Sequence, residues 1–216
     1  MRAPGPLYII AAGTLAAAAY VWWTNSQALA TDTSDGTDSD SASDWTGSFS
    51  DMGSTVSNLF TSVSSAVSDP NVQAFLTLIR TGEGTTGPNG YRTLYGGGLF
   101  TSYADHPPGT VTASGITSSA AGAYQILAGT WAEIKLAYSL PDFSPASQDI
   151  AAVALIKRRG ALADVEAGRF DAAIAKCAKE WASLPGSPYG QPTLTLDRAH
   201  QVLADAGGTQ TDGAYA

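Results

Sequence analysis

The spacing of apolar residues after position 69 predicts a helix that leads to a candidate site. Asp69 and Pro70 form a helix-start pair, because an aspartate can cap free backbone N–H groups and proline fits the first helical position. The apolar residues that follow lie on one helical face: Val72, Phe75, Leu76 and Ile79. Glu83 extends this face, where a carboxylate is not expected, and the flanking Gly82 and Gly84 predict that the helix ends here.

The pattern downstream of Glu83 predicts an α+β domain that is mainly helical. Between residues 91 and 111, β-forming residues interrupted by three consecutive glycines predict a short β-hairpin that forms one lip of a cleft. Cap residues, apolar positions and glycine stops predict four further helices, over residues 122–140, 145–159, 170–183 and 196–206.

Residues 7–23 form an uncharged, alanine-rich stretch that follows Arg2. Its length is marginal for a membrane span, which needs about 20 apolar residues. Aromatic residues at its far end, Tyr20, Trp22 and Trp23, suit a membrane interface and favour a retained anchor with a cytoplasmic N-terminus. Residues 28–30 also offer a signal-peptidase site, so a cleaved signal peptide remains the alternative for residues 1–30. Either interpretation predicts an exported protein that is membrane-tethered or periplasmic in a bacterial host. A virion-associated protein is a further alternative.

Two further segments precede the predicted domain. Residues 31–48 are mostly Ser, Thr, Asp and Gly, which predicts a disordered acidic linker. Within residues 49–68, apolar positions recur in steps of three and four among poor helix formers: Phe49, Met52, Val56, Leu59, Val63 and Ala66. This segment is interpreted as a weak amphipathic helix that is folded against the domain or only partly formed. The alternative is a helix that lies on a bilayer or pairs with copies of itself.

The charge distribution gives no sign of a nucleic-acid partner. The formal net charge is −8, and seven aspartates lie at or before position 69, with no Lys or Arg between residues 3 and 79. The remainder carries twelve acidic and ten basic residues, a net charge of −2. The domain therefore lacks the basic excess of a nucleic-acid-binding protein.

Glu83 is the candidate for acid–base chemistry. A carboxyl group among apolar neighbours resists ionisation, because desolvation disfavours its charged form, and it can therefore hold a proton near neutral pH. The alternative from the pattern alone is a helix-end glutamate that points into solvent.

Several motifs follow Glu83-Gly84-Thr85 in a fixed order. They are Gly90-Tyr91, Gly96-Gly97-Gly98-Leu99-Phe100, Tyr103, Asp105-His106-Pro107, Gly122-Ala123-Tyr124-Gln125, Asp142-Phe143-Ser144-Pro145, Ser147-Gln148-Asp149 and the run WASLPGSPYGQ from Trp181 to Gln191. Over residues 72–208 this set resembles the lambda-type peptidoglycan lytic transglycosylases, the family of the phage lambda endolysin.

The resemblance implies a lysozyme-like fold for residues 69–208, followed by a flexible tail at 209–216. It implies a peptidoglycan glycan strand as the partner, Glu83 as the catalytic residue, and cleavage of the β-1,4 bond between N-acetylmuramic acid and N-acetylglucosamine. The substrate-binding residues that it implies are Gln125, Tyr124, Tyr91, Tyr189 and Gln191. The chain departs from relatives at Arg92, where they carry Asp, and at Pro108, where they often carry Arg.

The lack of a second carboxylate soon after Glu83 favours a transglycosylase over a hydrolase. Hydrolytic glycosidases generally need two carboxylates, but no Asp or Glu lies between residues 84 and 104. Asp105 is the first candidate and is interpreted as a residue that holds its loop. With one carboxylate, the sugar's own 6-hydroxyl would attack and give a 1,6-anhydro product. The alternatives are a hydrolytic lysozyme and a non-catalytic wall-binding or membrane protein of a virion.

Other reactive residue types give no second chemistry. Cys177 is the sole cysteine and is interpreted as a buried structural thiol. His106 and His200 have no spaced partners that would predict a metal site, and no cofactor is expected. Trp181 is assigned to the core, with sugar stacking as the alternative.

Overall fold

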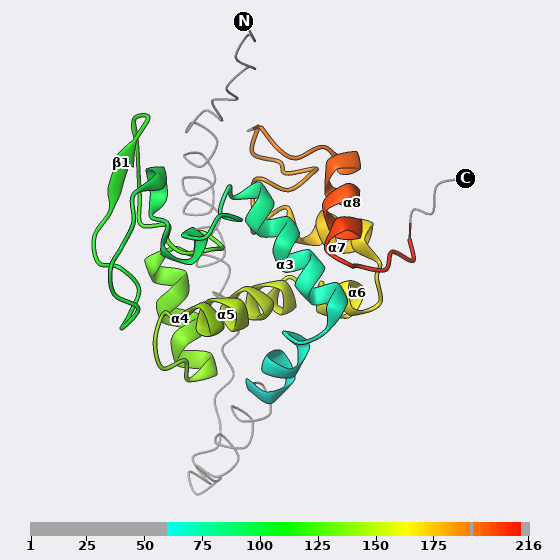
Figure 1. Ribbon diagram of the computed structural model, residues 1–216, viewed down its shortest axis with the longest axis horizontal. Coiled ribbons are helices and arrows are strands. Elements are labelled where there is room, and N and C mark those ends of the chain that lie inside the picture. Colours follow the sequence, from blue (N-terminus) through cyan, green and yellow to red (C-terminus); the bar gives the residue numbers. More distant parts are fainter. Residues whose placement is uncertain (1–59, 191, 213–216) are drawn as a thin grey trace, which may run out of the picture.

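Helix α3 (Pro70–Gly82) runs through the middle of the computed structural model, which describes residues 60–190 and 192–212 (Figure 1). Two short 3-10 turns follow it, at Gly90–Arg92 and Tyr95–Gly97. The remaining elements are strands β1 (Val111–Ala113) and β2 (Ile116–Ser118) and helices α4 (Ala128–Tyr138), α5 (Pro145–Arg158), α6 (Leu162–Glu166), α7 (Phe170–Cys177) and α8 (Leu196–Asp205).

Helix α3 begins and ends where its sequence predicts. The Asp69 carboxylate accepts the backbone N–H groups of Asn71 and Val72 at 2.8 and 3.1 Å, and Pro70 occupies the first turn. Its buried residues are Val72, Ala74, Phe75, Leu76, Leu78 and Ile79. The helix contacts α5, α6 and α8, so packing on several sides fixes its position and that of the residue that ends it.

The β-hairpin lies further along the chain than the sequence prediction placed it. Strands β1 and β2 pair antiparallel, with Val111 opposite Ser118, around a turn at Ser114 and Gly115. Both turn residues have positive φ, +50° and +80°, as a tight two-residue hairpin turn requires. In the predicted segment, Gly96 and Gly97 adopt positive φ and close a compact turn, flanked by an isolated antiparallel bridge between Thr93 and Leu99. The prediction of residues 91–111 is therefore wrong in position, although a small two-stranded sheet is present.

Two predicted helices are shorter than expected. Helix α4 begins at Ala128 and not near residue 122, and α7 ends at Cys177. Residues 121–126 form isolated bridges instead, in which Ala121 pairs with Leu94 and with Ile126. The segment that carries Tyr124 and Gln125 is therefore a tight loop before the helix.

Both ends of the described chain pack against the domain. Residues 60–66 are helical, and Val63 and Ala66 are buried in the main core. At the other end, the backbone N–H of Thr209 donates to Asn71 at 2.8 Å, and that of Thr211 donates to Gly168 at 2.8 Å. The Asp212 carboxylate accepts backbone N–H groups at the start of α7. Residues 209–212, expected in a flexible tail, are thus held by hydrogen bonds.

Some predictions concern residues outside the described ranges. These are the anchor or signal peptide at 7–23, the linker at 31–48 and residues 49–59 of the amphipathic segment. Within residues 60–190 and 192–212, no helix is long and apolar enough to cross a membrane.

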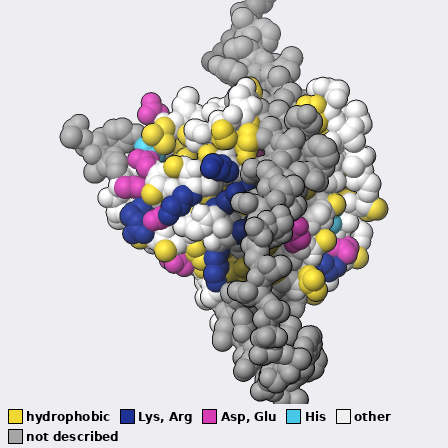
Figure 2. All heavy atoms as spheres, turned by 180° about the vertical axis from the view of Figure 1, so that it is seen from behind, with side chains coloured by type: hydrophobic (Ala, Val, Ile, Leu, Met, Phe, Trp, Pro, Cys, Tyr) yellow, Lys and Arg dark blue, Asp and Glu magenta, His cyan; other side chains and the backbone are white. Residues whose placement is uncertain are grey.

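The face shown in Figure 2 carries basic side chains interspersed with acidic ones. Ion pairs among the described residues join the helices: Arg158 with Glu133 and Glu180, Arg159 with Glu180, and Lys176 and Arg169 with Asp164. The pair with Glu133 is exposed and contributes little to stability, whereas the side chains of Glu180 and Asp164 are 3% and 11% exposed. Each of these basic side chains therefore has an acidic partner.

Candidate active site

Glu83 is buried at the end of α3, with 2 % of its surface exposed. Its backbone N–H still donates to Ile79 at 2.9 Å, so the side chain continues the apolar face of the helix. Gly84 follows with φ of +69° and turns the chain away. Burial raises the pKa of the Glu83 carboxyl to about 7, because the charged form loses its hydration, while a hydrogen bond from Ser183 acts in the opposite direction.

Ser183 brings a second segment of the chain to this carboxyl. Its hydroxyl donates to Oε1 of Glu83 at 2.7 Å. The serine lies between α7 and α8, and its carbonyl accepts the backbone N–H of Leu194 at 2.9 Å. The Glu83 carboxyl has a pKa near neutral pH and accepts a hydrogen bond from an uncharged hydroxyl. It can therefore give up a proton and take it back, as a general acid and base must.

Thr85 connects Glu83 to the loop at 122–125. Its backbone N–H donates to the carbonyl of Arg80 at 2.9 Å, and its hydroxyl donates to the carbonyl of Ala123. Thr85 is buried, with 2 % of its surface exposed. A buried hydrogen bond therefore joins the turn after α3 to this loop.

Gln148 on α5 fixes the same loop from the other side. Its Oε1 accepts the N–H of Ala123 at 2.8 Å, and its Nε2 donates to the carbonyls of Phe143 and Tyr91 at 2.8 and 3.0 Å. Gly122 is required beside it for two reasons. Its φ is +79°, and a Cβ there would lie 2.2 Å from Oε1 of Gln148.

Gln125, predicted to contact substrate, has an unusual backbone for a residue other than glycine, with φ of +49°. Its Nε2 donates to the carbonyls of Gly122 and Thr93 at 2.9 and 3.2 Å. Its Oε1 is buried and has no hydrogen-bond partner among the described residues. A buried acceptor without a partner is costly, and the predicted contact of Gln125 with substrate stays a prediction.

Tyr124 is buried and supports the loop, and its contact with substrate stays a prediction. Its side chain is 1 % exposed, and its hydroxyl donates to Asp149 at 2.6 Å. Tyr91, which is partly exposed, donates to the same carboxylate oxygen at 2.7 Å and stacks edge-on against Tyr124. Burial raises the pKa of Asp149, although both hydroxyls act in the opposite direction. Arg80 lies over the Tyr91 ring at 4.8 Å.

Gln148 and Asp149 were not predicted as site residues. The signal that could have found them is the motif Ser147-Gln148-Asp149 on a helix that begins at a capping serine and proline. The two residues are consecutive on α5. Gln148 accepts a hydrogen bond from the 122–125 loop, and Asp149 accepts the hydroxyls of Tyr91 and Tyr124.

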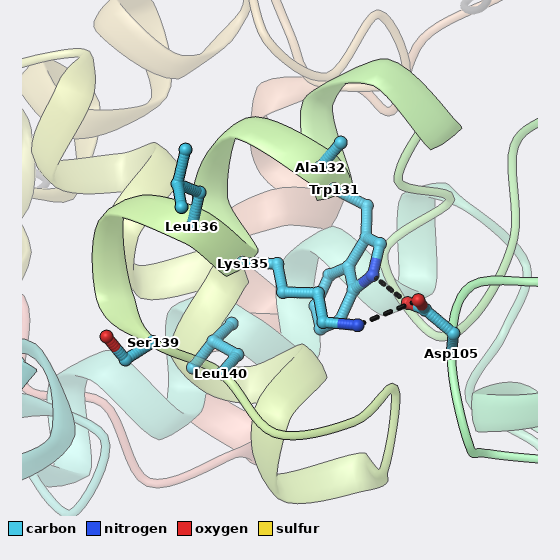
Figure 3. Close-up of a pocket in the computed structure, with 7 residues that line it drawn as sticks. All are labelled: Asp105, Trp131, Ala132, Lys135, Leu136, Ser139 and Leu140. Atoms are coloured by element: carbon cyan, nitrogen blue, oxygen red, sulfur yellow. Dashed lines mark hydrogen bonds and ion pairs between the residues drawn. The ribbon is translucent and has the colours of Figure 1, made fainter.

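Asp105 lies in a different environment, at a surface cavity of about 380 Å³ beside α4 (Figure 3). Its carboxylate accepts Nε1 of Trp131 and Nζ of Lys135, both at 2.7 Å. The hydrogen bonds from Lys135 and Trp131 lower its pKa to about 2. Asp105 is thus fully ionised at neutral pH and holds its loop to α4.

The other predicted contacts differ in accessibility. Tyr189 is partly exposed, and its hydroxyl donates to the carbonyl of Lys179 at 3.2 Å, while Gln191 lies outside the described residues. Trp181 is 4 % exposed and donates to the carbonyl of Tyr124 at 3.2 Å, as expected of a core residue. Arg92 donates to the carbonyl of Phe100 at 2.8 Å, and Pro108 is exposed.

The remaining reactive groups of the described chain do not form a second site. Cys177 is buried, and desolvation raises the pKa of its thiol. Within residues 60–190 and 192–212, no group of His, Cys, Asp and Glu side chains could hold a metal ion.

Comparison with known proteins places this chain among phage lysis proteins. The profile of the family described as Endolysin matches residues 73–210. The endolysin of Escherichia phage P2 is 42% identical over 154 residues, which cover 64% of this chain and 93% of that protein. The endolysin of Escherichia phage lambda is 42% identical over 144 residues, which cover 63% of this chain and 91% of that protein.

Solved structures show the same relation. Bacteriophage lambda lysozyme complexed with a chitohexasaccharide has a TM-score of 0.62 and 40% identity, covering 66% of this chain and 97% of the lysozyme. A second structure of lysozyme from bacteriophage lambda has a TM-score of 0.58 and 39% identity, with the same coverage.

Proposed function

This chain belongs to the endolysin family and has a lysozyme-like fold, and we propose that it cleaves bacterial peptidoglycan as a lytic transglycosylase. The observation that carries the proposal is Glu83, which is buried, hydrogen-bonded to Ser183 and close to half-protonated at neutral pH. The bound chitohexasaccharide of the related lysozyme supports a glycan strand as the ligand.

The reaction uses one carboxyl group twice. Glu83 donates its proton to the oxygen that links N-acetylmuramic acid to N-acetylglucosamine, and the bond from that oxygen to the anomeric carbon breaks. The N-acetyl group of the muramic residue stabilises the positive charge at this carbon. The Glu83 carboxylate then takes the proton of the 6-hydroxyl, and the freed oxygen bonds to the anomeric carbon. The products are a 1,6-anhydromuramic end and a free 4-hydroxyl on N-acetylglucosamine.

The environments of the other acidic residues support this mechanism over hydrolysis. No Asp or Glu lies between residues 84 and 104, and Asp105 is committed to Trp131 and Lys135. Asp149 is committed to two tyrosine hydroxyls. The candidate site therefore offers one proton-transferring carboxyl, and the second group that hydrolysis needs has no candidate among these residues.

Digestion of purified peptidoglycan in water enriched in ¹⁸O tests the mechanism. The transglycosylase should release 1,6-anhydromuropeptides without ¹⁸O, because no water enters the product. A hydrolase would release reducing muramic ends that carry ¹⁸O at the anomeric position. Mass spectra with the second pattern would replace our proposal with the hydrolytic lysozyme, and no release of either product would favour the non-catalytic wall-binding protein.

We also propose that residues 7–23 carry the domain to the outer side of the cytoplasmic membrane, as a retained anchor or a cleaved signal peptide. Support comes from Arg2, the uncharged stretch and the absence of basic residues between positions 3 and 79. Fractionation of expressing bacteria, followed by N-terminal sequencing, distinguishes the two. A protein found in the cytosol alone would contradict both.

A further inference from the structure

Ser183 reaches Glu83 from a segment that lies 100 residues further along the chain. Its hydroxyl donates to Oε1 at 2.7 Å, and the Leu194 N–H holds its carbonyl at 2.9 Å. Trp181, two residues earlier, donates to the carbonyl of Tyr124 at 3.2 Å. Contacts on both sides therefore hold this serine at the end of α3.

Gly82 leaves the space that Ser183 occupies. A Cβ at position 82 would lie 2.5 Å from the serine Oγ and 2.9 Å from its Cβ. Gly82 is the last residue of α3 and does not have a positive φ, so an alanine there would be compatible with the helix. The requirement for glycine is therefore the close approach of Ser183 rather than the backbone conformation.

The hydrogen bond makes the two oxygens of Glu83 different. A hydroxyl has one hydrogen, and Ser183 directs it at Oε1, which must then act as an acceptor. In this arrangement the proton of the neutral acid lies on Oε2. After proton transfer, the same hydroxyl stabilises the buried carboxylate with a charge-assisted hydrogen bond.

We propose that Ser183 is the positioning residue of the acid, which fixes the oxygen that carries the transferable proton and stabilises the carboxylate formed when that proton leaves. This inference rests on the proposed function, because it assigns Ser183 a role through Glu83. Gly82 contributes to this role, because its lack of a side chain allows Ser183 to approach Glu83.

Loss of the Ser183 hydroxyl should raise the pKa of the Glu83 carboxyl. A donor that favours the charged form lowers the carboxyl pKa, so its removal raises the pKa of Glu83 further above its value of about 7. A hydrogen bond to a charged group corresponds to about one pH unit. Because the active form carries the proton, the alkaline limb of kcat/KM should move to higher pH.

The experiment compares Ser183→Ala and Gly82→Ala with the full-length parent. The pH dependence of kcat/KM on purified peptidoglycan is measured, together with a ¹³C NMR titration of the Glu83 carboxyl. Both variants should shift the alkaline limb and the titration upward by about one unit. The two variants reach the same hydrogen bond by different routes, so poor folding of one leaves the other as the test.

Ser187→Ala is the matched control. Ser187 lies in the same segment, and its buried hydroxyl has no hydrogen-bond partner among the described residues. Its pH profile should coincide with that of the parent. Titration of Glu83 at the parental pH in folded Ser183→Ala would overturn the positioning role.

Glu83→Gln, assayed in parallel, distinguishes failure of this inference from failure of the proposed function. An inactive Glu83→Gln with an unshifted Ser183→Ala removes the positioning role and leaves the proposed function intact. An active Glu83→Gln removes the proposed function, and with it the reason for a positioning residue.

Discussion

Glu83 and Asp105 are carboxylates 22 residues apart in environments of opposite character. Glu83 is 2 % exposed and receives a neutral hydroxyl, whereas the Asp105 side chain is 56% exposed and receives an ammonium and an indole N–H. Their pKa values move apart accordingly, to about 7 and about 2.

The comparison shows that solvation and donors decide the role of a carboxyl, rather than residue type or closeness in sequence. Desolvation keeps Glu83 able to carry a proton at neutral pH, which acid catalysis needs. Charged and neutral donors keep Asp105 ionised, which suits a structural contact and prevents it from serving as an acid at that pH.

Removal of the carboxyl from each residue in turn should have the largest and most unequal effect. Glu83→Gln keeps the shape of the side chain but cannot transfer a proton, and the loss of a general acid lowers the rate by about 10² to 10⁴-fold. Asp105→Asn should stay within about threefold of the parent, because the loss of a surface ion pair is small. Initial rates of release of soluble muropeptides measure both. Equal losses in the two variants would contradict the division of roles.

The stability of the parent should depend on pH through Glu83. Its pKa is 4.5 in the unfolded reference and about 7 in the folded protein, so the folded state binds more protons between these values. The contribution of Glu83 to the free energy of unfolding therefore falls as the pH rises from about 4.5 to about 7, by about 3 kcal/mol in all. Glu83→Gln lacks this term. The free energy of unfolding of the variant relative to that of the parent, measured with urea, should be higher at pH 8 than at pH 5. The same difference at both pH values would contradict a buried Glu83 that holds a proton.

Gly122 tests whether the loop beside Glu83 depends on its close packing. Gly122→Ala places a Cβ 2.2 Å from Oε1 of Gln148 at a φ of +79°, and this overlap together with the strained φ should cost about 1 to 3 kcal/mol of stability. It should also lower activity, because Gln125 shifts with the loop. Gly129→Ala is the control. Gly129 lies in α4 with no atom within 4 Å of an added Cβ, so alanine should stabilise the protein by about 0.5 to 1 kcal/mol. Thermal melts and initial rates measure both variants.

The central helix could be predicted from sequence because its signals are local. The cap at Asp69, the proline at position 70 and the apolar positions up to Ile79 each act within a few residues, and the structure places α3 between Pro70 and Gly82. The position of Glu83 on the apolar face follows from the same spacing, and its burial confirms that interpretation.

The loop at 122–125 could not be predicted because distant residues determine it. Gln148 and Thr85 make the hydrogen bonds that hold Ala123 in place. The Tyr124 hydroxyl donates to the Asp149 carboxylate, which keeps its side chain buried. The pattern around Tyr124 resembles a helix start, and only these tertiary contacts make it a buried loop. The hairpin lies elsewhere for a local reason. Gly96 and Gly97 close a turn flanked by an isolated antiparallel bridge between Thr93 and Leu99, whereas the paired strands form around Ser114 and Gly115.

The smallest effect should come from the pH dependence of Asp105. Its pKa is 3.8 in the unfolded reference and about 2 in the folded protein, so its stabilising contribution is present above pH 3.8 and is lost as the pH falls towards 2. The side chain is more than half exposed, so solvent screening limits this contribution to within about 1 kcal/mol. Asp105→Asn should therefore match the parent at pH 2 and be slightly less stable at pH 6, a trend opposite in sign to that of Glu83. Addition of salt should reduce the difference at pH 6, because the Lys135 ammonium and the carboxylate both face solvent. A difference that grew towards acid pH would place Asp105 with Glu83 as a desolvated acid.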